Sequence, residues 1–115
     1  MIKKKIEIPI YLGYLVIIVT DDFKKIIKKY NIASSSDPND HDYSAITFRL
    51  YKKRISNYYC VLRKKASPGA IAHEAKHIVN KIFQDRGINL DIVNDENETY
   101  LLGWIVNQIY KILKK

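Results

Sequence analysis

Cysteine is nearly absent from this 115-residue sequence, because Cys60 is the only one. A single thiol excludes a disulfide within the chain. Cys60 lies in an apolar run of strand-forming residues, so we expect it to be a buried strand residue, which fits a reducing compartment.

Long hydrophobic runs are also missing. The lysines of residues 3–5 and the apolar stretch after them resemble the start of a secretory signal, but Glu7 and Pro9 interrupt the stretch and no small-residue cleavage site follows. The stretch is also shorter than the roughly 18 apolar residues of a membrane span. We therefore expect a cytoplasmic protein with no signal peptide and no membrane partner.

Acidic residues are few compared with basic ones, at 12 against 20, and the formal net charge is +8. Such a surface attracts anions non-specifically. Because the lysines are spread along the chain, we expect them to cover solvated faces and chain ends, and nucleic-acid binding stays the alternative. The basic groups lie within residues 3–5, 24–29, 52–53, 64–65 and 114–115.

At 115 residues the chain has the size of a single domain with one core, residues 1–115, and its 47% of hydrophobic residues argues against disorder. Strand-forming residues predict two hairpins, and apolar residues at helical spacing predict three helices. The expected strands are residues 6–10 and 14–20, then 43–51 and 57–64. The expected helices are residues 21–30, then Ser67 with Pro68 to about residue 86, then Asp95 onward.

This order of elements predicts an α+β fold, in which a small antiparallel sheet packs against the two long helices. The serine- and aspartate-rich residues 33–42 predict a loop. Strand 57–64, just before the second helix, is the expected edge along which an extended peptide would pair.

The chemistry of the sequence is concentrated in residues 73–77, which read His-Glu-Ala-Lys-His. Residues four apart on a helix share one face, so His73 and His77 can bind one zinc ion. Glu74 points to the side, where its carboxylate can act as a base toward water on the metal. The pattern is that of zinc peptidases. The alternative is two surface histidines on an amphipathic helix.

A catalytic zinc site takes three protein ligands, so a third must come from elsewhere. The first turn of the last helix holds Asp95, Glu96 and Glu98, and these carboxylates are the better source. His41 is the only other histidine, and it lies in the loop of residues 33–42.

Two segments resemble the gluzincin zinc peptidases: residues 67–77, which read Ser-Pro-Gly-Ala-Ile-Ala-His-Glu-Ala-Lys-His, and residues 95–105. Within that family the chain is similar to small peptidase-like proteins of bacteriophages and bacteria, and in plan to the repressor-cleaving metallopeptidases of mobile elements. The resemblance implies that a downstream glutamate is the third ligand, and its spacing before Thr99 and Tyr100 favours Glu96. Helical periodicity instead groups Glu98 with the apolar face of that helix.

The resemblance also implies a peptide or protein substrate, whereas the motif alone indicates only a hydrolytic zinc site. We therefore expect a zinc-dependent peptidase with His73, His77 and Glu96 as ligands and Glu74 as the catalytic base. The alternative is a non-catalytic zinc-stabilised module of phage type, used for structure or interaction.

Overall fold

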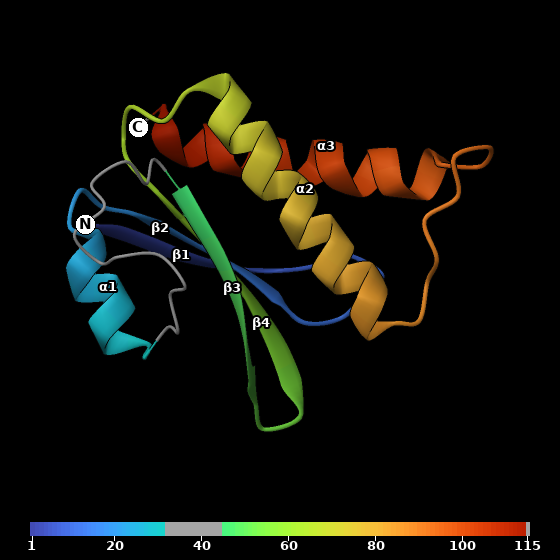
Figure 1. The fold of residues 1–115 in the computed structure, drawn as a ribbon, viewed down its shortest axis with the longest axis horizontal. Coiled ribbons are helices and arrows are strands. Elements are labelled where there is room, and N and C mark those ends of the chain that lie inside the picture. Colours follow the sequence, from blue (N-terminus) through green and yellow to red (C-terminus); the bar gives the residue numbers. More distant parts are fainter. Residues whose placement is uncertain (32–44, 115) are drawn as a thin grey trace.

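The computed structural model describes residues 1–31 and 45–114, which form four strands and three helices (Figure 1). The predicted loop of residues 33–42, with His41, lies outside the described residues. The strands are β1 (Ile2–Glu7), β2 (Tyr14–Val19), β3 (Ala45–Lys52) and β4 (Ile55–Leu62). The helices are α1 (Phe23–Lys29), α2 (Pro68–Asp85) and α3 (Glu96–Leu113).

The four strands form one sheet in the order β1-β2-β4-β3. Both predicted hairpins are present, since β1 pairs antiparallel with β2 and β3 pairs antiparallel with β4. The first strand lies earlier in the sequence than predicted, because it runs over residues 2–7 and not 6–10 and so includes the lysines of residues 3–5. The hairpins meet through β2 and β4, which run parallel, with Val16 opposite Tyr59. The α+β class is confirmed, but the sheet is mixed rather than wholly antiparallel. A turn sequence fixes the direction of strands within a hairpin and carries no information on how two hairpins dock.

Strand β4 is central, so the prediction that it forms a peptide-binding edge is wrong. It is paired along its length on both sides, with β2 and with β3. Its backbone hydrogen-bonding groups are therefore used within the sheet. Among the described strands, β1 and β3 are the edges.

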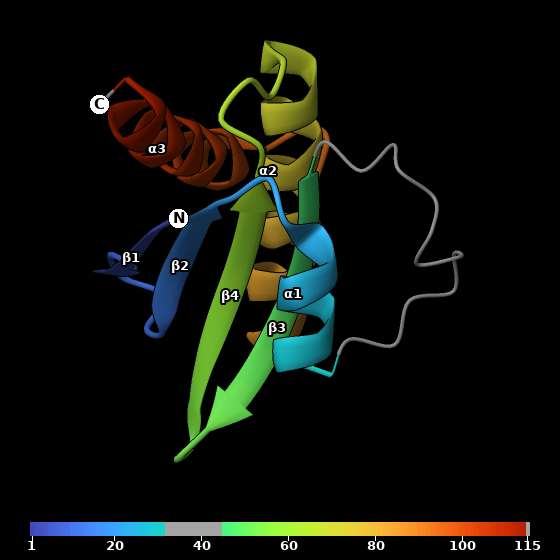
Figure 2. The ribbon, with the colours of Figure 1, turned by 90° about the vertical axis from the view of Figure 1, so that its left-hand side faces the viewer.

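Both faces of the central strands are covered (Figure 2). In β2 and β4 alternate side chains point to opposite faces, as strand geometry requires. One set packs against α2 and α3 and the other against α1. This explains why β2 reads as an unbroken apolar run. The first set is Leu15, Ile17, Val19, Tyr58, Cys60 and Leu62, and the second is Val16, Ile18, Tyr59 and Val61.

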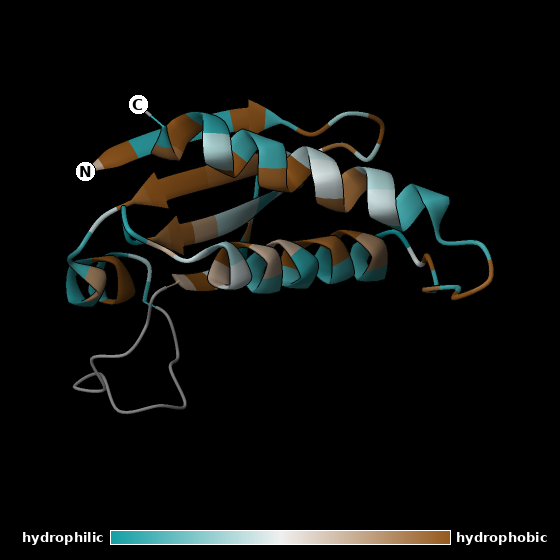
Figure 3. Cartoon of the chain, turned by 90° about the horizontal axis from the view of Figure 1, so that it is seen from above, coloured by the Kyte–Doolittle hydropathy of each residue, from teal (hydrophilic) through white to brown (hydrophobic). Residues whose placement is uncertain are grey.

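The two long helices form where the sequence predicts them. Ser67 caps α2, because its hydroxyl accepts a hydrogen bond from the Ala70 amide at 3.1 Å, and Pro68 occupies the first turn. The helix stops before Gly87, whose φ of +67° suits a residue without a Cβ. Seen from above, both helices alternate hydrophobic and hydrophilic segments (Figure 3). None of the helices in the described part of the chain is long and apolar enough to cross a bilayer.

Candidate metal centre

His73 and His77 lie one turn apart on α2, and the structure brings their side chains together. Their Nε2 atoms are 3.1 Å apart, and the two rings meet edge to face with centroids 4.6 Å apart. Two nitrogens bound to one tetrahedral zinc ion at 2.0–2.1 Å are about 3.3 Å apart. The histidine pair therefore has nearly the separation that a shared metal ion requires.

Both histidines are exposed on the outer side of α2. Ala75, midway between them in the sequence, is fully buried against the sheet. Successive helical residues are turned by about 100°, so His73 and His77 each lie about 200° from Ala75. The pair consequently faces away from the core and toward solvent, and its two Nε2 atoms are within hydrogen-bond distance of each other.

Glu74 is half-buried on the flank of α2 between the histidine face and the buried face. Its carboxylate is near enough to β4 to affect Cys60. Burial is the main cause that raises the pKa of the Cys60 thiol, and the negative charge of Glu74 adds to it. Glu74 is thus an anionic group at the border of the core, beside an exposed histidine pair.

The glutamates at the start of α3 differ in their exposure and in their contacts. Glu98 forms an ion pair with Lys76, the residue before His77, and its side chain is only 19% exposed. Glu96 is exposed, and its carboxylate forms no hydrogen bond or ion pair with the described residues. The first turn of α3 therefore lies beside the middle of α2, with Glu98 rather than Glu96 directed toward it.

The third ligand is not assembled with the histidine pair. Within residues 1–31 and 45–114 no three His, Cys, Asp or Glu side chains are grouped closely enough to hold a metal ion. The spacing of His73 and His77 suits two of the ligand positions around one zinc ion. Glu98 would first have to leave Lys76, and Glu96 would have to turn toward the histidines. The assignment of Glu96 as a ligand stays a prediction.

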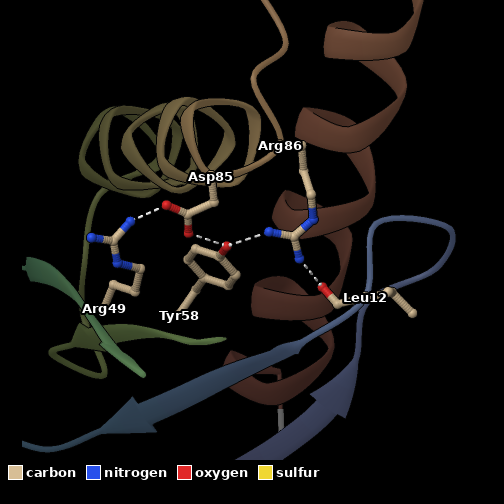
Figure 4. Close-up of polar contacts among 5 residues, drawn as sticks. All are labelled: Leu12, Arg49, Tyr58, Asp85 and Arg86. Atoms are coloured by element: carbon tan, nitrogen blue, oxygen red, sulfur yellow. Dashed lines mark hydrogen bonds and ion pairs between the residues drawn. The ribbon is translucent and has the colours of Figure 1, made fainter. Parts of the chain in front are cut away.

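A second polar site, at the far end of α2, was not predicted from the sequence (Figure 4). Asp85 forms an ion pair with Arg49 of β3 and accepts a hydrogen bond from the Tyr58 hydroxyl at 2.5 Å. Arg86 donates to the same hydroxyl at 3.3 Å and to the Leu12 carbonyl at 2.7 Å. Burial, followed by the bond to Asp85, raises the pKa of Tyr58.

This network borders a hollow of about 770 Å³ between the β1–β2 loop, the β3–β4 hairpin and the end of α2. Asp85 is eight residues beyond His77, or about 12 Å along the helix axis, so the hollow is separate from the histidine pair. Its charged residues come from four elements far apart in the sequence. No local spacing links them, so the sequence offered no signal for the site. They are Glu7, Arg49, Arg54, Asp85 and Arg86.

Comparison with known proteins adds no identification. No family model, no curated protein and no solved structure matches this chain. The resemblance to gluzincins therefore stays a prediction that depends on residues 67–77 and 95–105.

Proposed function

We propose that this chain is a zinc-dependent peptidase in which His73 and His77 hold the metal ion and Glu74 is the catalytic base. One observation carries the proposal: the Nε2 atoms of the motif histidines are 3.1 Å apart on a capped helix and open to solvent. A catalytic zinc site needs positions left free for water and substrate. An exposed pair meets that need.

Zinc, Glu74 and the third ligand would each have a separate role in hydrolysis. Zinc, when bound, supplies a Lewis acid that allows water to react near neutral pH. Glu74 takes the proton of the attacking water and passes it to the leaving amine, so the amine departs as a neutral group. A carboxylate from the first turn of α3 completes the ligand set, with Glu96 favoured by the resemblance and Glu98 by its position toward the middle of α2.

The second candidate is the non-catalytic zinc module. Structural zinc ions are fully enclosed by four protein ligands and stabilise the fold when those ligands come from different elements. Here the two histidines belong to one helix and face away from the core. Zinc bound by the pair and by one carboxylate of α3 would keep a fourth position open for water, which supports catalysis over a structural role.

Zinc binding is tested by titration against a chromophoric chelator. Wild type should bind one ion per chain, and His73→Ala and His77→Ala should each lose stoichiometric binding at micromolar protein. His41→Ala removes the remaining histidine and is the matched control. If His73→Ala keeps its zinc, the site lies elsewhere. Weaker binding in Glu96→Gln or in Glu98→Gln identifies the third ligand.

Catalysis is tested with Glu74→Gln on a library of peptide substrates. The change is nearly isosteric, so zinc and fold should be retained while hydrolysis falls by about a hundredfold or more. Melting with and without a chelator separates the two candidates. Removal of a structural zinc ion would leave the chain unfolded, whereas the peptidase should stay folded without zinc and lose only the part of its melting temperature that ligand binding adds. Unchanged hydrolysis in Glu74→Gln would refute its role as base.

A further inference from the structure

Helix α1 lies on the face of the sheet opposite to α2 (Figure 2), and six exposed lysines belong to α1 or to the strand β1 beside it. Lys3 pairs with Ile18 and Lys5 with Val16, and both partners belong to the core beneath α1. Residues directly opposite in an antiparallel pair point to the same face, so the two lysines lie on that face. The α1-face lysines, all exposed, are Lys3, Lys5, Lys24, Lys25, Lys28 and Lys29.

Two tyrosines stand among these lysines. The Lys5 Nζ atom is 4.3 Å from the centre of the Tyr14 ring. The Lys3 Nζ atom donates to the Tyr30 hydroxyl at 3.2 Å. The Tyr30 ring is held by Tyr59, at a centroid distance of 4.9 Å, and both Tyr14 and Tyr30 are half-buried. The Tyr30 ring is therefore fixed in place, and part of each ring remains accessible.

Only part of the charge on α1 serves the stability of the helix, namely Lys28 and Lys29 in its last turn, where cations favour the helix dipole. Lys24 and Lys28 are four residues apart, as are Lys25 and Lys29, and like charges at this spacing destabilise a helix. The first turn has no acidic residue and carries Lys24 and Lys25, which oppose the helix dipole. Among the described residues none of the six lysines forms an ion pair, whereas Lys76 is paired with Glu98. A bound polyanion would offset both the repulsion between these lysines and their unfavourable interaction with the helix dipole.

The surroundings of the lysines favour nucleic acid over a membrane. Membrane-surface binding needs apolar side chains that enter the lipid next to the basic residues. The apolar residues of α1, Phe23 and Ile26, are buried. Met1, which is 69% exposed, is the strongly exposed apolar residue beside Lys3, and others lie elsewhere, for example Ile10 in the β1–β2 loop and Val93 between α2 and α3. Lysines combined with accessible aromatic rings are the means by which proteins hold single strands.

We propose that this face binds single-stranded nucleic acid without sequence preference. The α1-face lysines contact phosphates, and Tyr14 and Tyr30 stack on bases. Lysine lacks the planar fork with which arginine reads guanine, so no base-specific readout is expected. The face is opposite to the one that carries α2, so binding does not depend on the zinc proposal.

The test is fluorescence anisotropy with a labelled DNA strand of about 20 nucleotides, long enough to cover the site of a single small domain. Six phosphate contacts predict a slope of about −4 for log K against log salt. A quadruple variant with Lys3→Gln, Lys5→Gln, Lys25→Gln and Lys29→Gln should bind at least about tenfold more weakly and reduce the slope by about 3.

A charge-matched control separates a defined face from net charge alone. Lys64→Gln, Lys65→Gln, Lys111→Gln and Lys114→Gln together remove the same charge from exposed positions outside the α1 face. This variant should keep most of the affinity, and His73→Ala should bind as wild type does. Equal losses in the two quadruple variants would overturn the proposal.

Two further probes test the ligand class. Inorganic polyphosphate has the charge but no bases, and Tyr14→Leu should weaken DNA binding while leaving polyphosphate binding unchanged. If Tyr14→Leu has no effect on DNA, the face is a general anion surface and the proposal fails. Tighter lysine-dependent binding to vesicles rich in phosphatidylserine would also overturn it, in favour of a membrane surface.

Discussion

Replacing Tyr58 by phenylalanine is the sharpest test of the polar network that joins the sheet to the end of α2. Tyr58 is fully buried, and its hydroxyl donates to Asp85 at 2.5 Å and accepts from Arg86 at 3.3 Å. The variant keeps the ring and its packing and removes only this hydroxyl. Any change in stability then reports on the two hydrogen bonds.

The expected loss of unfolding free energy depends on which polar contacts Asp85 and Arg86 keep in the variant. A hydrogen bond to a charged group contributes about 1.5–3 kcal/mol. Asp85 keeps its ion pair with Arg49, and Arg86 still donates to the carbonyls of Tyr11 and Leu12. Neither partner is left without a hydrogen-bonding group, so the loss should lie near the lower end, at about 1.5 kcal/mol. For a chain of this size that lowers the melting temperature by about 6 °C.

The pH dependence has a definite sign. Burial first, and then the bond to Asp85, raises the pKa of Tyr58 above its ordinary value of 10.0. The unfolded chain therefore loses this proton at lower pH than the folded chain. The stabilisation is complete below pH 10 and declines as the pH rises above it. The gap in unfolding free energy between wild type and Tyr58→Phe should shrink above pH 10.

Denaturant unfolding at pH 7 and at several values above pH 10 measures both effects. Tyr51→Phe is the matched control, because Tyr51 is 66% exposed and the same atom is removed. The control should differ from wild type by less than about 0.5 kcal/mol. If Tyr58→Phe is as stable as Tyr51→Phe at pH 7, or if its deficit grows above pH 10, the reasoning about this network is wrong.

Two further predictions concern the folded core and the start of α2. Cys60 is fully buried and the pKa of its thiol is raised, so a thiol reagent should label it only as fast as the protein unfolds; rapid labelling of the native chain would contradict this. Ser67→Ala removes the cap of α2 and should cost about 1 kcal/mol in denaturant unfolding, whereas Ser67→Gly should cost only a few tenths. An unchanged stability in Ser67→Ala would show that the hydroxyl is not the capping group.

The parts of the fold that depend on neighbouring residues were predictable. Ser67 and Pro68 mark the start of α2, and the spacing of Leu101, Ile105 and Ile109 marks the buried face of α3. The parallel pairing of β2 with β4 was not predictable, because it depends on contacts between two hairpins. The turn of β3 and β4 has positive φ at Lys53 and Arg54, although neither is a glycine or asparagine, so its conformation also had no clear signal.

In the candidate metal centre too, the features set by neighbouring residues were predictable and those set by long-range contacts were not. The convergence of His73 and His77 follows from one helical turn, so their spacing in the sequence was sufficient. Periodicity also predicted that Glu98 shares the packed face of α3, and its side chain is indeed mostly covered beside Lys76. Which carboxylate reaches the histidines depends on how α3 lies against α2, and that is set by the whole core.

The histidine pair lies outside the core, so folding would not require a metal ion bound to it. In small zinc-stabilised domains the ligands come from different elements, so the chain folds only when the metal joins them. Here the sheet is covered on both faces by apolar side chains, and those of α2 and α3 bury one side of it without a ligand from either histidine. The core can therefore hold α2 in place before any ion binds. A metal ion on the outer side of that helix would be free to exchange water and substrate, which is the condition that hydrolysis requires and a structural ion does not.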